Sequence, residues 1–217
     1  MSLEVKCLEN ELMKSNCYIL TDVASKSCVI IDPASEKSER EIDYIDNNGL
    51  HLDYILLTHE HSDHTWGANS LKEKYPEAKI VCSELCEKYA KKSSKAYFLL
   101  YYNKKGYRYK LMPADIIIHS DEDVLNWRDV EIHFVMTPGH SYGSMCIDID
   151  GMLFTGDTIL PFEAYFNGRD SNEEEWYNSI KQIAIVYCRD TLVYPGHGNP
   201  FVLNDWYLKN SFVFSII

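Results

Sequence analysis

Short apolar runs alternate along this chain with longer segments in which apolar side chains recur every three or four positions. The short runs are bounded by Gly, Pro, Asn and Asp and predict β-strands, whereas the longer period predicts amphipathic helices. The predicted strands cover residues 3–8, 16–21, 27–32, 53–57, 79–82, 115–118, 131–136, 144–149, 151–155 and 191–194. The predicted helices cover residues 36–48, 65–74, 83–91, 173–186 and 203–210. This order predicts two packed sheets with helices outside them, an α/β fold with α+β layering.

The strand at 53–57 runs directly into a segment rich in metal-ligand side chains. Residues 58–64 read Thr-His-Glu-His-Ser-Asp-His, so the segment holds His59, His61, Asp63 and His64. Alternate residues of an extended backbone point the same way, and a helix opening at the next turn would bring Asp63 and His64 to a second position. One ion does not accept four such ligands and a reacting water, so the spacing favours two adjacent sites over a solvated polar turn. Imidazole and carboxylate donors suit zinc or iron rather than calcium.

Three later turns each place one further candidate ligand directly after a predicted strand. They are Pro138-Gly139-His140, Thr155-Gly156-Asp157 and Pro195-Gly196-His197. Glycine lets the backbone approach a metal without Cβ crowding, and strand ends are where open sheets present functional groups. Any one of these turns taken alone is ordinary, but the ordered set indicates a single site.

Taken together, these motifs resemble the metallo-β-lactamase superfamily, whose signature is His-x-His-x-Asp-His followed by a His, an Asp and a His. The resemblance covers nearly the whole chain and is weakest over residues 87–112. It implies a four-layer αβ/βα sandwich with the metal site between the edges of the two sheets. It also implies two ligand sets that share Asp157: His59, His61 and His140 for one ion, and Asp63, His64 and His197 for the other.

The resemblance implies a hydrolase that uses two divalent metal ions, with zinc favoured and iron or manganese as options. Two cations lower the pKa of the water between them, so a hydroxide nucleophile exists at neutral pH. Asp157 would set the separation of the ions, and Asp63 would orient the nucleophile. The motifs are most similar to those of single-domain glyoxalase-II-like enzymes, which predicts a thioester or another activated ester as substrate.

Two other reactions remain open at this point. A persulfide dioxygenase type of oxidoreductase shares the fold but uses one iron, for which His59, His140 and Asp157 would suffice. A lactonase shares the metal set, but such enzymes usually carry Tyr where this chain has Leu160. A true β-lactamase is disfavoured because those enzymes lack an aspartate at the position of Asp157.

The substrate-binding residues are less well defined than the ligands. Tyr142 lies beside His140 and either lines the pocket or packs. Arg169 belongs to a Gly-Arg-Asp segment that lacks one residue of the family's pattern, and only 20 residues follow His197. A separate glutathione-binding helical domain is therefore not expected, and glutathione thioesters are doubtful substrates.

A basic, aromatic stretch at residues 88–110 contains Lys104 and Lys105. It is either a solvated face or an entrance that attracts a small anionic substrate. Asp32, at the end of the 27–32 strand, either starts a turn or orients a metal-binding histidine, as the resemblance implies. Cys82 and Cys86 are interpreted as buried apolar residues rather than as a metal or redox pair.

Composition narrows the choice of partners and compartment. A chain of 217 residues predicts one domain over residues 1–217, and a formal charge of −12 argues against a nucleic-acid partner. No apolar run is long enough to span a membrane, and the first residues do not resemble a signal peptide. Seven scattered cysteines indicate a reducing, cytoplasmic location. The sequence leaves the oligomeric state open.

Overall fold

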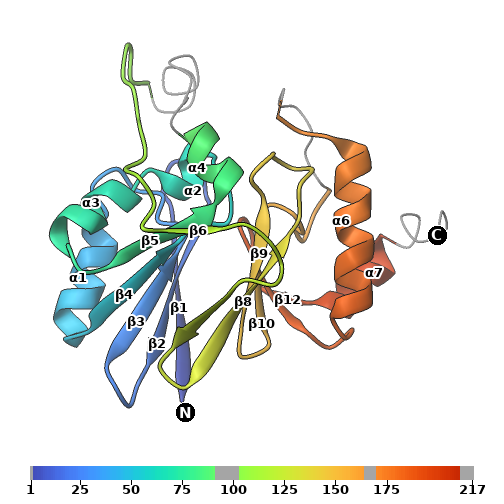
Figure 1. Ribbon diagram of the computed structural model, residues 1–217, viewed down its shortest axis with the longest axis horizontal. Coiled ribbons are helices and arrows are strands. Elements are labelled where there is room, and N and C mark those ends of the chain that lie inside the picture. Colours follow the sequence, from blue (N-terminus) through green and yellow to red (C-terminus); the bar gives the residue numbers. More distant parts are fainter. Residues whose placement is uncertain (1, 91–102, 164–169, 211–217) are drawn as a thin grey trace. The chain divides into compact units, whose positions relative to one another are not determined.

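The computed structural model describes residues 2–90, 103–163 and 170–210 of the chain. The backbone forms two compact units, Met1–His119 and Ser120–Ile217. Each unit is built on its own six-stranded sheet with flanking helices (Figure 1). The expectation of one domain over the whole chain stays a prediction.

The sheet of the first unit has the order β1-β2-β3-β4-β5-β6. Its strands are β1 (Leu3–Glu9), β2 (Asn16–Asp22), β3 (Ser27–Ile31), β4 (His51–Leu56), β5 (Lys79–Ser83) and β6 (Ile116–Ile118). Strands β1 to β3 are antiparallel neighbours, whereas β3 to β6 run parallel. The helices between the parallel strands are α1 (Glu39–Asn48), α2 (Ser62–Thr65), α3 (Ala68–Lys74) and α4 (Glu84–Ala90).

One core joins the helices of this unit to its sheet. Ile45 of α1 and Leu71 of α3 pack with Ile30, Ile55 and Ile80 from three neighbouring strands. All five side chains are completely buried. Burying a side chain of this size contributes about 1.5–3 kcal/mol. This packing fixes the strand ends from which the candidate metal ligands project.

The sheet of the second unit has the order β12-β11-β10-β9-β8-β7. Its strands are β7 (Val124–Trp127), β8 (Val130–Met136), β9 (Met145–Ile149), β10 (Met152–Gly156), β11 (Leu192–Pro195) and β12 (Phe201–Val202). All neighbours are antiparallel except β10 and β11. Helices α6 (Glu173–Val186) and α7 (Leu203–Lys209) belong to one core with β8 to β11 through side chains such as Trp176 and Trp206.

Strands β7 and β12 were not predicted from the sequence. Trp127 of β7 pairs with Val130 of β8 across a two-residue turn in which Arg128 has a φ of 55°. That left-handed conformation is normally signalled by Gly or Asn, so an Arg-Asp turn hides the hairpin. Strand β12 contains only two residues, too few for a periodic pattern. No helix in the described ranges is long and apolar enough to cross a bilayer.

The helix predicted at 65–74 is wrong in its start and its continuity, because the structure has α2 and α3 separated at Gly67. At this point the chain passes very close to the loop that follows β3. The Gly67 N–H donates to the Pro33 carbonyl over 2.8 Å, and Ser38 Oγ donates to the Gly67 carbonyl over 3.2 Å. A Cβ on residue 67 would lie 2.7 Å from the Ser35 carbonyl oxygen, so only glycine fits. The loop after β3 and the end of α2 are thereby held together.

Replacing Gly67 with alanine should lower the free energy of unfolding by about 1–3 kcal/mol, the usual cost of overpacking. The Cβ would lie 2.2 Å from Ser38 Oγ as well as 2.7 Å from the Ser35 carbonyl oxygen, and a backbone carbonyl cannot move aside as a flexible side chain would. Gly49→Asn is the control, because Gly49 has a φ of 61° and a Cβ there would meet no atom within 4 Å. Urea unfolding curves measure both; equal losses would contradict the close approach.

Candidate metal centre

The first unit carries four candidate ligands at the end of β4 and in α2. His59 lies in the bend that follows β4, His61 has an extended backbone directly before α2, and α2 begins at Ser62 with Asp63 and His64 in its first turn. The His64 N–H donates to the His61 carbonyl over 3.0 Å, which closes this turn. The predicted helix opening beside the His-x-His pair is therefore present, earlier in the chain than its periodicity indicated.

The ligand atoms in this unit are spaced as neighbours around metal ions. Two donors about 2.1 Å from one ion at tetrahedral angles lie about 3.4 Å apart. His59 Nε2 is 3.2 Å from His61 Nδ1, and His64 Nε2 is 3.8 Å from Asp63 Oδ2. The rings of His59 and His64 are 4.2 Å apart, between centroids. The donor set and its spacing therefore fit zinc or another divalent ion of similar size.

Asp32 determines which nitrogen of two of these histidines carries the proton. Its carboxylate accepts hydrogen bonds from the Thr58 N–H at 2.8 Å and the Thr58 hydroxyl at 2.6 Å. His64 Nδ1 lies 3.0 Å from the same carboxylate, which only accepts, so this nitrogen carries a proton. The Thr58 hydroxyl has already donated its hydrogen, so His59 Nδ1, 3.0 Å from its oxygen, must be the donor there. His59 and His64 both keep Nε2 as the lone-pair donor for a metal.

The second unit carries three candidate ligands, two histidines and an aspartate, and both histidines lie near one oxygen of the aspartate. Asp157 Oδ2 lies 3.5 Å from His140 Nε2 and 3.5 Å from His197 Nε2. These separations exceed the usual 2.7–3.2 Å of a good hydrogen bond but match the distance between neighbouring metal ligands. Asp157 Oδ2 is thus at the distance of a neighbouring ligand from both His140 and His197.

Backbone contacts hold the three turns of the second unit in place. The Gly196 N–H donates to the Gly156 carbonyl over 2.7 Å, which ties the turn of His197 to that of Asp157. Gly139 has a φ of 138°, and any Cβ there would collide with the backbone of Trp176. The Trp176 indole in turn donates to the Thr158 carbonyl over 2.7 Å. Helix α6 therefore supports both the His140 turn and the Asp157 turn.

The predicted substrate-binding residues differ in their surroundings, and their role stays a prediction. Tyr142 is 38% exposed. Lys105 is exposed, whereas Lys104 forms an ion pair with Glu36. Arg169 lies outside the described residues. Contacts of these residues with a substrate stay predictions.

The cysteine pair of the first unit has the character expected of core residues. Cys82 and Cys86 are fully buried in the apolar core. Burial raises the pKa of the Cys86 thiol well above its usual value, and a hydrogen bond with Cys82 raises it further. The protonated thiol is a poor metal ligand and nucleophile. This supports the interpretation of the pair as buried apolar residues.

Sequence reasoning missed Thr58, although it precedes the His-x-His pair directly. Its importance depends on pairing: β3 and β4 are parallel neighbours with Ile31 opposite Leu56, so Asp32 and Thr58 follow at adjacent strand ends. A threonine between a predicted strand and the His-x-His pair could have indicated this role, if the pairing of β3 with β4 had been considered.

Thr58→Val should weaken zinc binding by about 10–100-fold, the usual effect of removing a partner behind a metal-bound histidine. The variant keeps the side-chain shape but removes the acceptor that fixes the His59 proton. Competition against a chromophoric chelator measures the affinity. Thr21→Val is the matched control, because this buried hydroxyl has no hydrogen-bond partner within the described part of the chain. Equal affinities in the two variants would contradict the proton assignment.

Comparison with known proteins identifies the family of the chain. A family model of the metallo-beta-lactamase superfamily matches residues 11–197. The chain is 29% identical over 211 residues to a probable polyketide biosynthesis zinc-dependent hydrolase, BaeB, of Bacillus velezensis, covering 95% of this chain and 84% of that protein. It is 28% identical over 197 residues to a hydroxyacylglutathione hydrolase of Pelagibacter ubique, covering 89% and 69%.

Solved structures show the same fold. The B3 metallo-beta-lactamase BLEG-1 superposes with a TM-score of 0.83 at 23% identity, over 97% of this chain and 99% of that one. ETHE1 from Myxococcus xanthus superposes with a TM-score of 0.78 at 22% identity, over 98% of this chain and 85% of that one. The predicted αβ/βα sandwich fold is thereby confirmed. From the match over residues 11–197 and the common fold, this chain belongs to the metallo-β-lactamase superfamily.

Proposed function

We propose that the chain is a dinuclear metal-dependent hydrolase that acts on a thioester or another activated ester. The observation that carries the proposal is Asp157, whose one carboxylate oxygen lies 3.5 Å from the Nε2 atoms of both His140 and His197. A carboxylate shared by two histidines is what a bridging ligand requires. The family's motif assigns one ion to His59, His61 and His140, the other to Asp63, His64 and His197, and Asp157 to both.

When bound, two divalent ions supply a water of lowered pKa and a Lewis acid for the substrate carbonyl. The chain's own residues prepare the site for them. Asp32 and Thr58 hold protons on Nδ1 of His59 and His64, which keeps both Nε2 lone pairs available. Asp63, 3.8 Å from His64, offers a carboxylate that can accept a hydrogen bond from a water and orient it.

Zinc is the metal that we propose first, with iron or manganese as alternatives. Imidazole and carboxylate donors suit all three, and the name of the relative from Bacillus velezensis includes zinc dependence. No Cys or Ser nucleophile is needed in this scheme. Consistent with that, burial raises the pKa of Cys146, close behind the ligand turns of the second unit, to about 12.

The thioester proposal rests on the relative named hydroxyacylglutathione hydrolase, whose named substrate is a thioester. The alignment covers only 69% of that protein, so the proposal extends to the bond cleaved and not to glutathione itself. A small anionic acyl compound suits the exposed Lys105, while the −12 charge of the chain disfavours nucleic acid.

The alternative of a mononuclear iron oxidoreductase explains fewer of the residues. Such a site would need only His59, His140 and Asp157. It leaves no role for the pair of His64 and Asp63, although Asp32 orients His64. A lactonase is disfavoured by Leu160, which is buried and provides no hydroxyl where those enzymes usually have tyrosine.

Asp157→Ala should reduce the metal content below two equivalents per chain and abolish turnover, because both ions lose a ligand. Elemental analysis of protein purified without added metal or chelator gives the content. Asp205→Ala, which removes an exposed carboxylate from α7, is the control and should retain both metal and activity. Unchanged metal content in Asp157→Ala would exclude the bridging role.

Hydrolysis of acyl thioesters should be lost on dialysis against a chelator and restored by zinc. A panel that includes acyl thioesters, lactones and a β-lactam, followed by thiol release or product analysis, separates the reaction classes. Oxygen uptake with a persulfide, accompanied by one equivalent of iron, would instead establish the oxidoreductase alternative.

A further inference from the structure

The helix that carries Asp63 and His64 is too short to be stable by itself. Helix α2 spans only Ser62–Thr65, and isolated helices of so few residues do not persist in water. Its position must therefore come from contacts with other parts of the first unit. Since the ligand atoms of Asp63 and His64 move with this helix, those contacts also determine the geometry of the candidate metal centre.

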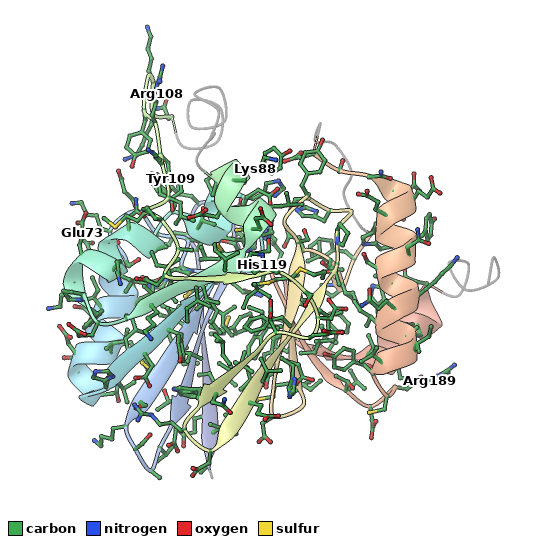
Figure 2. The ribbon with its side chains drawn as sticks, viewed as in Figure 1. Glu73, Lys88, Arg108, Tyr109, His119 and Arg189 are labelled. Carbon is green, nitrogen blue, oxygen red and sulfur yellow. The ribbon has the colours of Figure 1, made fainter. Side chains whose placement is uncertain are left out.

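Residues 104–112, which we call the anchor segment, provide such contacts at the end of α2. The Tyr109 hydroxyl donates to the Thr65 carbonyl over 2.5 Å, and the Trp66 indole N–H donates to the Tyr107 hydroxyl over 3.0 Å. Tyr109 and Trp66 are 5% and 4% exposed. Figure 2 shows Arg108 at the outer end of this segment and Tyr109 nearer the helices of the first unit. The segment thus holds in place the residues that directly follow the ligands.

Lys104 connects this anchor segment to a second element. Its ammonium group lies 5.1 Å from the centroid of the Trp66 ring and 5.0 Å from that of Tyr107, within the range of cation–π attraction. The same group forms an ion pair with Glu36. Glu36 belongs to the loop that follows β3, four residues after Asp32. Lys104 therefore bridges the loop that begins with Asp32 and Trp66, the residue that directly follows α2.

The distance between that loop and α2 matters because Asp32 and His64 are hydrogen-bonded across it. Asp32 Oδ2 lies 3.0 Å from His64 Nδ1, and the Gly67 N–H to Pro33 carbonyl bond of 2.8 Å spans the same junction. A separation of the two elements would weaken the Asp32–His64 bond, since a hydrogen bond requires a short distance and good alignment. The Lys104–Glu36 pair is positioned to oppose that separation.

We propose that Lys104 is a positioning residue for the metal centre, acting through Glu36, Trp66 and Tyr107 to hold Asp32 against His64. The inference rests on the proposed two-metal function. It replaces the expectation that Lys104 steers anionic substrate, because the ammonium group is already engaged by a carboxylate and two aromatic rings. The exposed Lys105 keeps the steering role as a prediction.

The test compares Lys104→Met with Lys110→Met in the full chain. Methionine keeps the length and much of the apolar stem of lysine but removes the charge. Lys110 lies in the same segment with an exposed side chain, so its replacement controls for the loss of one positive charge. Lys104→Met should lower the affinity for the more weakly bound zinc ion by about tenfold, whereas Lys110→Met should leave that affinity unchanged. Tenfold is the lower end of the usual effect of removing a group that supports a metal ligand. Equal affinities would overturn the proposal.

A second readout does not depend on metal. Hydrogen exchange of the Gly67 amide, followed by NMR in zinc-free protein, reports the junction directly because that amide donates to Pro33. It should speed up by about tenfold in Lys104→Met and in Glu36→Gln, but not in Lys110→Met. Glu36→Gln also tests the pair if Lys104→Met folds poorly.

The two readouts separate this proposal from the proposed function. If the wild-type chain holds one metal, the proposed function fails, whereas selective acceleration of Gly67 exchange still supports the positioning role of Lys104. Unchanged Gly67 exchange in Lys104→Met and Glu36→Gln overturns the positioning role.

Discussion

The structure of the candidate centre depends on the hydrogen bonds accepted by one buried carboxylate. Asp32 accepts from the Thr58 amide, the Thr58 hydroxyl and His64 Nδ1, at 2.8, 2.6 and 3.0 Å. Through the Thr58 hydroxyl it also determines the protonation of His59. Two imidazoles are thereby held in the tautomer that presents Nε2, the form a metal needs. Removing this carboxylate would leave both rings free to present the wrong nitrogen.

The fold places this carboxylate by the parallel pairing of β3 and β4. Asp32 follows β3 and Thr58 lies two residues beyond β4, so adjacent parallel strands deliver both to the same sheet edge. Asp32 adopts a φ of 54°, a left-handed conformation that aspartate tolerates better than most residues. The close approach at Gly67 then holds α2 beside the same edge. Sheet register, backbone conformation and glycine packing thus act together on one hydrogen-bond network.

Much of this architecture could be predicted from the sequence. The ten predicted strands and the helix at 173–186 have counterparts in the structure, because apolar periodicity reports burial directly. The dense His-x-His-x-Asp-His segment identified the family, since that many ligands in so short a segment have few other uses. Strand β7 was missed because its Arg-Asp turn carries no glycine. The interruption at Gly67 and the roles of Thr58 and Lys104 depend on contacts between distant residues, which local patterns do not contain.

The central claim is that this chain holds two metal ions in one centre and hydrolyses its substrate there. X-ray absorption of the zinc-loaded protein, with zinc counted per chain, tests it most directly. The account predicts two equivalents, nitrogen and oxygen atoms but no sulfur bound to the metal, and a metal–metal separation of about 3.5–4 Å. One equivalent with no metal–metal scattering, or a sulfur atom bound to the metal, would contradict it.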